Sequence, residues 1–285
     1  MKANQVTIKQ ALKEGSDFLD SDFPNPQNEA LILLQYAAHR TKEYLLAHSE
    51  KNLSPENLKR FQSFLDRRDK GEPLAYITEE KEFWSLPFYV TQGVLIPRPE
   101  SEQLVESTLE IVKNKADAKI LDLGTGCGCI ALSIAKEKPS SQIVACDISD
   151  TCINAARTNA NNLGIQNVSF IRSHWFSAIE GQDFDIIVCN PPYIAEDDKN
   201  IEVNVEKFEP DIALFSGETG LDDLYHIIRE APGYLTDSGS LILEHGWEQS
   251  ENVQIEMQKN NFHDISTLKD IQNHDRVTTG IQLKQ

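Results

Sequence analysis

Hydrophobic and polar positions follow three successive patterns along the chain. In the first 75 residues apolar side chains recur at helical intervals, for example between the start signal Ser54-Pro55 and the stop signal Lys70-Gly71. Aromatic and β-branched residues then dominate, which is typical of a β-hairpin. Beyond them, short apolar runs alternate with amphipathic segments. We therefore predict a helical domain over residues 1–75, a hairpin linker over 76–95 and a larger domain over 96–285.

The alternation in the larger domain predicts βαβ units and a mostly parallel sheet, which is an α/β fold class. The apolar runs predict strands at 119–123, 142–147, 168–171, 184–189 and 240–244. The amphipathic segments predict helices at 101–112, 130–136, 150–163 and 221–231. Two late strand-like segments, 262–268 and 276–283, are expected to close the sheet as a hairpin.

Composition is that of a soluble globular protein, with 40% hydrophobic and 25% charged residues. No apolar run approaches the length that spans a bilayer. The start of the chain, Met1–Thr7, lacks the apolar core of a signal peptide. We therefore expect a cytoplasmic protein without a membrane partner.

Cysteine usage agrees with a reducing compartment. The five cysteines are odd in number, and most lie within or beside predicted strands, as reduced space-filling thiols do. They are Cys127, Cys129, Cys146, Cys152 and Cys189. Cys127 and Cys129 lack the two-residue spacer of a zinc-binding cysteine pair, and no second such pair follows. We therefore expect no metal site.

The formal net charge of −18 bears on the kind of partner. Proteins that grip phosphate backbones usually carry a basic surface, so direct nucleic-acid binding is not expected. A basic protein partner would be steered toward this chain. The alternative is that the charge serves solubility alone.

The most informative motif is the tetrapeptide Asn190-Pro191-Pro192-Tyr193, which follows the apolar run Phe184–Cys189. The run is typical of a buried strand, and it must end here because neither proline has an N–H for a ladder. A carboxamide, free backbone carbonyls and an aromatic face remain, and they can bind a planar –NH2 group by both hydrogens. The alternative is an ordinary turn.

A glycine-rich loop, Gly124-Thr125-Gly126-Cys127-Gly128, follows the predicted strand at 119–123 and precedes a helix. Glycines let the backbone pass close to a ligand. The dinucleotide fingerprint would need a third glycine at position 129, which is Cys129 here. The loop therefore indicates a nucleoside-type cofactor rather than a pyrophosphate cradle.

Two further residues fit such a cofactor. Asp147 ends the next predicted strand, about 20 residues past the loop, where related folds place an acid that binds the ribose diol. Its alternative role is to cap the helix that begins near Asp150. Trp175 follows the third strand of the sheet and could stack on a purine, or it could be a half-buried core aromatic.

The chain carries the glycine-rich loop, the acid Asp147 and the tetrapeptide in this order along an alternating α/β pattern. In this it resembles the class I S-adenosylmethionine-dependent methyltransferases. Three more segments sharpen the likeness: Val94–Glu102, Phe208–Leu214 and Gly217–Leu221. With them the chain resembles the release factor glutamine methyltransferases, the PrmC/HemK family, over nearly its whole length. Ser101 stands where threonine is more usual in that family.

The resemblance implies a Rossmann-like, mostly parallel seven-stranded sheet with a small N-terminal helical domain joined by a β-hairpin. It also implies N5-methylation of the glutamine in the Gly-Gly-Gln motif of class 1 peptide chain release factors, a step of translation termination. The helical domain would dock this partner, although a scaffolding role is equally open. Carried over residue by residue, Gly124, Thr125, Gly126, Cys127, Gly128, Asp147, Trp175 and Asn190 would bind S-adenosyl-L-methionine.

The catalytic hypothesis centres on Asn190 and Pro191. Their side-chain and backbone oxygens would accept the two amide hydrogens, and the whole tetrapeptide, with Pro192 and Tyr193, would hold the substrate glutamine. Nucleobase amines in RNA or DNA present the same planar –NH2 group and remain an alternative. A ribosomal-protein glutamine is a second alternative, and a non-catalytic cofactor-binding module is a third.

Overall fold

The computed structural model describes residues 6–19, 23–181 and 183–283. The chain divides into two compact units, Met1–Glu79 and Glu80–Gln285. Most of the N-terminal stretch considered for a signal peptide, residues 1–5, lies outside the described part. Within the described residues no helix has both the length and the apolar character needed to cross a membrane.

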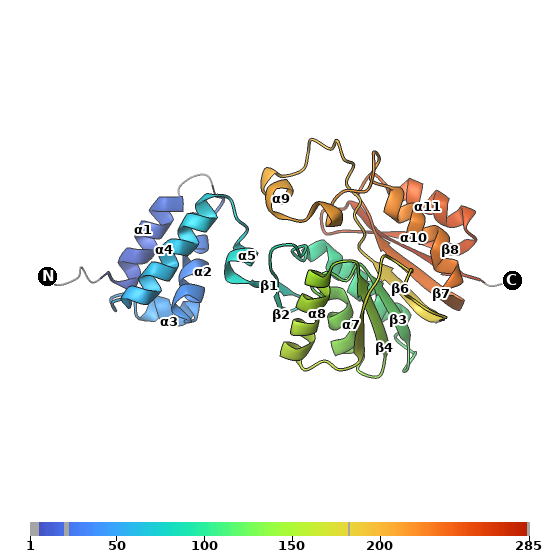
Figure 1. The fold of residues 1–285 in the computed structure, drawn as a ribbon, viewed down its shortest axis with the longest axis horizontal. Helices are drawn as coiled ribbons and strands as arrows, with labels where there is room; N and C mark the ends of the chain where they lie inside the picture. The colour runs from blue at the N-terminus through green and yellow to red at the C-terminus, as the bar shows by residue number, and fades with distance from the viewer. Residues whose placement is uncertain (1–5, 20–22, 182, 284–285) are drawn as a thin grey trace. The chain divides into compact units, whose positions relative to one another are not determined.

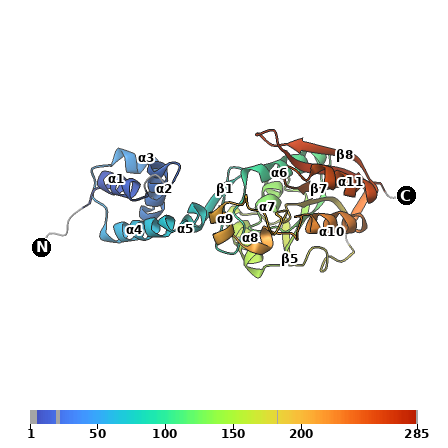
Figure 2. The same ribbon diagram turned by 90° about the horizontal axis from the view of Figure 1, so that it is seen from above.

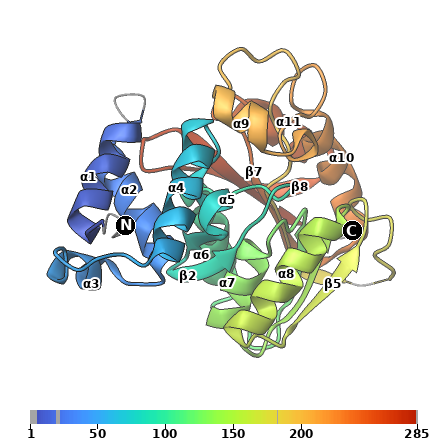
Figure 3. The same ribbon diagram turned by 60° about the vertical axis from the view of Figure 1, so that its left-hand side comes forward.

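The first unit is helical, as the spacing of its apolar residues predicts. Its helices are α1 (Ile8–Leu19), α2 (Pro26–Ala38), α3 (Lys42–Ala47), α4 (Pro55–Asp69) and α5 (Leu74–Thr78). Ser54 caps α4 by accepting the N–H of Asn57, which confirms the predicted start signal. α1, α2 and α4 pack together around a core that includes Leu33, Leu34 and Phe61 (Figure 3).

The second unit begins with the antiparallel hairpin of β1 (Glu80–Phe83) and β2 (Leu86–Tyr89). The hairpin starts four residues later than the sequence pattern suggests. Tyr76 belongs to α5 instead, where it is buried together with Ala75 and Ile77. An aromatic residue beside Ile and Thr has strand-like composition, but burial on a helix decides its structure.

A seven-stranded sheet forms the centre of the second unit, in the order β5-β4-β3-β6-β7-β9-β8. Its strands are β3 (Lys119–Leu123), β4 (Gln142–Asp147), β5 (Val168–Arg172), β6 (Phe184–Cys189), β7 (Leu235–Glu244), β8 (Phe262–Lys269) and β9 (Asp275–Gln282). The first five are parallel neighbours, and β8 and β9 close the sheet as an antiparallel hairpin, as predicted. Figure 1 shows this mostly parallel sheet, and Figure 2 shows it from above.

Helices cover both faces of the sheet. α6 (Glu102–Ile111), α7 (Cys129–Glu137) and α8 (Asp150–Leu163) lie side by side, and α10 (Asp222–Glu230) packs beside α11 (Ser250–Lys259) (Figure 3). Residues from β3, β6 and β7 form one apolar cluster with α10 and α11. Because β3, β4, β6 and β7 are parallel, their carboxyl ends meet at one edge, where the predicted site residues lie.

Candidate active site

The glycine-rich loop leaves β3 and enters α7 in a conformation that few residues adopt. Gly124, Gly126 and Gly128 all have positive φ, at 68°, 56° and 85°. A Cβ on Gly128 would lie 3.0 Å from Leu132 Cδ1, so this glycine lets α7 pack closely. A Cβ on Gly126 would meet nothing within 4 Å, because this glycine faces the open pocket.

Asp147 ends β4 beside the loop. Its Oδ2 accepts the N–H of Gly126 at 2.9 Å, and its Oδ1 accepts the N–H of Ser149 at 2.9 Å. The N-cap of α8 is Ser149, whose hydroxyl accepts the Cys152 N–H, so Asp147 is not the helix cap; it holds the turn before α8 and ties the loop to β4. Burial raises the pKa of this carboxyl. A carboxylate oxygen can accept more than one hydrogen bond, so the contacts with Gly126 and Ser149 do not exclude a ligand hydroxyl.

Trp175 lies against the loop from the third parallel strand. Its Nε1 donates to Asp223 Oδ1 at 3.0 Å, and Asp223 is fixed in turn by the hydroxyl of Ser216 at 2.7 Å. The ring is close enough to Gly124 that a Cβ there would lie 3.4 Å from it. Trp175 has a φ of 47°, a left-handed value that is costly for a tryptophan, and this turn aims the indole at the pocket.

The tetrapeptide follows β6 at the same edge. Asn190 Nδ2 donates to Ser101 Oγ at 3.0 Å, so the opposite end of the carboxamide, Oδ1, is available to a ligand. The hydroxyl of Tyr193 donates to Glu244 Oε1 at 3.3 Å, and the Tyr193 carbonyl accepts from Gln249 at 3.0 Å. Both ends of the tetrapeptide are thus held by side chains from elsewhere in the unit.

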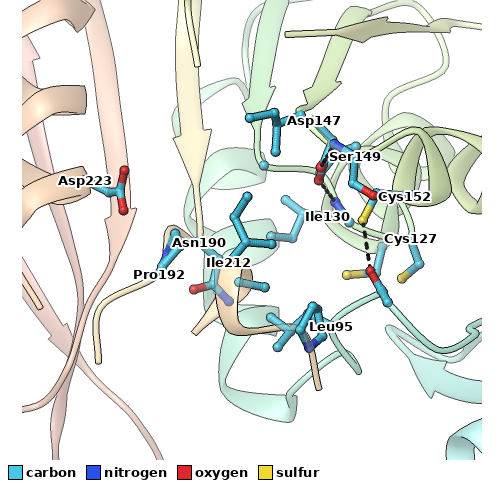
Figure 4. Close-up of a pocket in the computed structure, with 18 of the residues that line it drawn as sticks. Leu95, Cys127, Ile130, Asp147, Ser149, Cys152, Asn190, Pro192, Ile212 and Asp223 are labelled. Atoms are coloured by element: carbon cyan, nitrogen blue, oxygen red, sulfur yellow. Dashed lines mark hydrogen bonds between the residues drawn. The ribbon is translucent and has the colours of Figure 1, made fainter. Parts of the chain in front are cut away.

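One pocket brings most of the predicted site residues together. Gly124, Thr125, Gly126, Cys127, Asp147, Trp175, Asn190 and Pro192 line it. Gly128, Pro191 and Tyr193 are not among its lining residues. Gly128 lies beneath the loop against α8, and Tyr193 has turned its hydroxyl to Glu244. Figure 4 shows Asp147 and Asn190 at the ends of two different strands around this space.

The other side of the pocket comes from two segments that the sequence analysis used for the family likeness but did not place in the site. One contains Leu95 and Arg98, and the other runs from Pro210 to Phe215. Glu209 connects them, because its carboxylate accepts the Ile96 N–H at 3.0 Å and pairs with the Arg98 guanidinium. These contacts span more than 110 residues of sequence, so no local spacing could signal them.

The cysteine side chains in and around the pocket are buried. Burial raises the pKa of both Cys146 and Cys152 to about 12, which leaves them unreactive as nucleophiles at neutral pH. All five cysteines are free, as expected from the sequence. Among the described residues no cluster of His, Cys, Asp and Glu side chains could hold a metal ion.

Comparisons with known proteins agree with this geometry. A family model described as a methyltransferase small domain matches residues 102–209, and the PrmC N-terminal domain model matches residues 10–78. The release factor glutamine methyltransferase of Shewanella oneidensis is 41% identical over 98% of this chain and 97% of its own length. The Escherichia coli protein of the same name is 41% identical over 90% of this chain and 92% of its own length. The chain belongs to the release factor glutamine methyltransferase family.

Solved structures place this family member among the class I methyltransferases by fold. A methyltransferase from Pyrococcus furiosus aligns with a TM-score of 0.53 at 15% identity, covering 78% of this chain and 98% of its own. The hMettl16 catalytic domain aligns with a TM-score of 0.55 at 15% identity, covering 80% of this chain and 82% of its own. The predicted fold class, a mostly parallel seven-stranded sheet preceded by a helical domain and a hairpin, is confirmed.

Proposed function

We propose that this protein methylates N5 of the glutamine in the Gly-Gly-Gln motif of class 1 peptide chain release factors, with S-adenosylmethionine as methyl donor. The observation that carries the proposal is the pairing of full-length similarity to enzymes of that name with a free Asn190 Oδ1 beside the pocket. The protein would thus act as a transferase on a protein substrate.

The pocket residues suit S-adenosylmethionine. Asp147 has acceptor positions left for a ribose diol, and the Trp175 indole offers a flat face for a purine. The open space at Gly126 lets a ligand approach the backbone of the loop that spans Gly124 to Gly128. When bound, the donor supplies a methyl group already activated on a sulfonium sulfur.

The protein's part is to position the acceptor nitrogen. An amide nitrogen is a weak nucleophile because its lone pair is delocalised into the carbonyl. Asn190 Oδ1 and the Pro191 carbonyl would each accept one amide hydrogen, which fixes the nitrogen and stabilises positive charge as it develops. Tyr193 would flank the amide plane and exclude water. No strong base is needed, since the nitrogen becomes more acidic once it is methylated.

The rival substrate, a nucleobase amine, is disfavoured by charge. With a net charge of −18 the chain would repel phosphate backbones, whereas a basic surface on a protein partner would be attracted. The helical unit, which matches the PrmC N-terminal domain model, is the proposed docking domain for that partner. A ribosomal-protein glutamine remains a candidate to include in the test.

The test is to incubate the purified protein with labelled S-adenosylmethionine and, separately, a release factor, ribosomal proteins or RNA. We expect one methyl group on the Gly-Gly-Gln glutamine by mass spectrometry and none on RNA. Asn190→Ala should slow the transfer by on the order of 10² to 10³ while changing cofactor affinity less. Label in RNA or in a ribosomal protein, with none in the release factor, would contradict the proposal.

A further inference from the structure

One buried carboxylate binds the Tyr193 end of the tetrapeptide and lies near Ser101, the partner of its Asn190 end. Glu244 is the last residue of β7, next to β6 in the sheet, and it is 1% exposed. Its Oε1 accepts the Tyr193 hydroxyl at 3.3 Å, while its Oε2 is buried without a hydrogen-bond partner among the described residues. The hydroxyl of Ser101 is close enough to stabilise the charged form of Glu244, although it does not complete a hydrogen bond to Oε2.

Ser101 is also the partner of Asn190. This serine ends the short 3₁₀ turn η2 (Pro99–Ser101), is 2% exposed and receives the Asn190 Nδ2–H at 3.0 Å. A carboxamide has a donor end and an acceptor end of nearly the same shape. Only the acceptor end can take a hydrogen from a substrate –NH2 group. The direction of the Asn190 carboxamide therefore decides whether the site can bind its acceptor at all.

A serine hydroxyl alone does not fix that direction, because it can either donate or accept. A neighbouring carboxylate removes the ambiguity. While Glu244 is ionised it only accepts, so its charge attracts the Ser101 proton and leaves the Ser101 oxygen to accept from Asn190 Nδ2 at 3.0 Å. We infer that Glu244 and Ser101 are positioning residues that hold the carboxamide oxygen of Asn190 toward the amide to be methylated. This inference rests on the proposed function.

The surroundings of Glu244 make its charge sensitive to mild acid. Burial raises the pKa of Glu244 to about 6, and Glu100 on η2 adds to the rise. Three groups lower the pKa of Glu244 in the opposite direction: the Ser101 hydroxyl, Arg276 on β9 and the Tyr193 hydroxyl. Arg276 is shared with Asp270, and the adjacent His245 is itself buried with a lowered pKa. Once protonated, Glu244 can donate to the Ser101 oxygen. The Ser101 hydroxyl can then donate to the Asn190 carboxamide oxygen, which turns that oxygen away from the substrate amide.

The first experiment uses the full-length protein and its glutamine substrate. Ser101→Ala should lower kcat by on the order of 10- to 100-fold, a smaller loss than that expected for Asn190→Ala. Its cofactor affinity, measured by calorimetry, should be unchanged. Ser101→Thr keeps the hydroxyl and should restore the rate. Ser107→Ala is the matched control, because Ser107 on α6 is also buried but its hydroxyl has no partner among the described residues. Full kcat in Ser101→Ala would overturn the inference.

The second experiment is a pH profile of kcat. The wild-type rate should fall below a pH of about 6. Glu244→Gln should be slow at every pH and lack this acidic limb, whereas Glu256→Gln, which alters a buried carboxylate on α11, should retain the limb. An unchanged acidic limb in Glu244→Gln would overturn the inference. A wild-type protein that methylates no glutamine would instead refute the proposed function, so the two failures are distinct.

Discussion

Gly126 and Gly128 are two residues apart, yet an added methyl group would meet different surroundings at each. At Gly126 it would meet nothing within 4 Å and would project into the pocket. At Gly128 it would press on Leu132 and on Ala156, at 3.0 and 3.1 Å. Both positions carry positive φ, so each alanine also incurs roughly 1–2 kcal/mol of backbone strain.

We therefore expect the two alanine variants to separate cofactor binding from stability. Gly126→Ala should weaken S-adenosylmethionine binding by at least about tenfold, with a stability loss limited to the backbone strain. Gly128→Ala should lose clearly more stability, since packing is disturbed as well. Calorimetric titration and urea unfolding of both variants measure the two effects. If the two variants lost the same affinity and the same stability, the loop would have no side that faces the ligand.

Asp122, also in this region, was given no role by the sequence analysis. It is fully buried below the glycine loop, and its Oδ2 accepts the Thr125 hydroxyl at 2.6 Å. Its Oδ1 has no hydrogen-bond partner among the described residues. Burial raises the pKa of this carboxyl from 3.8 to about 7. Between these values the folded protein retains a proton that the unfolded chain has lost, so stability falls as pH rises through this window.

Asp122→Asn removes this titration and should change the pH dependence of unfolding. From pH 5 to pH 8 the wild type should lose roughly 2–3 kcal/mol relative to the variant, because each unit of pKa shift corresponds to about 1.4 kcal/mol. Urea unfolding of both proteins at the two pH values gives the difference directly. Parallel pH profiles would mean that Asp122 titrates normally.

At the scale of elements, the segment from Ile194 to Phe215 supplies one wall of the pocket with its residues 210–215, and Glu209 ties it to the stretch around Ile96. That side chain is 2% exposed and accepts from the Ile96 backbone while pairing with Arg98. α9 (Val203–Phe208), which precedes it, contributes no buried residue. Backbone hydrogen bonds of Ile194 with Leu214 and Ser216 hold the two ends of the segment together, and Glu209 ties it to Ile96 and Arg98.

Glu209→Ala should loosen the segment and raise the cofactor Kd by about tenfold, or about 1.4 kcal/mol. The pocket wall at Pro210–Phe215 would lose its anchor, and the Ile96 N–H would lose its acceptor. Glu206→Ala is the control, because Glu206 is exposed on α9. Calorimetry reports the affinity, and an unaltered Kd in Glu209→Ala would show that the wall is held by other contacts.

Elements with strong apolar periodicity were predictable from the sequence, and those without it were not. β3, β4, β6 and α8 have the predicted bounds. α9 was missed because none of its side chains is buried, and α11 was missed although it buries Val253, Glu256 and Met257. β7 was predicted from Ser240 but begins at Leu235, since Ser238, with φ of 63°, interrupts its alternation beside a register shift against β6.

The same limit applies to the candidate site. The loop, Asp147 and Asn190 lie in local motifs, so their spacing was informative. The contacts of Asn190 with Ser101 and of Tyr193 with Glu244 join residues 89 and 51 positions apart. Such partners are brought together only by the order of strands in the sheet. A motif therefore identifies the groups that touch a ligand better than the groups that orient them.

At the scale of the whole molecule, charge is divided unevenly between the two units. Residues 1–79 contain 11 lysines and arginines against 12 aspartates and glutamates, so nearly all of the net charge of −18 belongs to residues 80–285. Each unit has an apolar core of its own. Long-range attraction of a basic substrate is thus a property of the catalytic unit, whereas the helical unit would recognise its partner by short-range contacts.

A protein reduced to residues 80–285 tests this division of labour, because that unit holds the whole sheet and the whole pocket. It should bind S-adenosylmethionine as the full chain does and methylate a short Gly-Gly-Gln peptide at a similar kcat/KM. With an intact release factor, kcat/KM should fall by on the order of 100-fold, since docking no longer raises the local concentration of the glutamine. Radiolabel transfer to both substrates, at low and high salt, measures these rates. Equal loss on peptide and on protein would mean instead that the helical unit supports the catalytic unit rather than docking the partner.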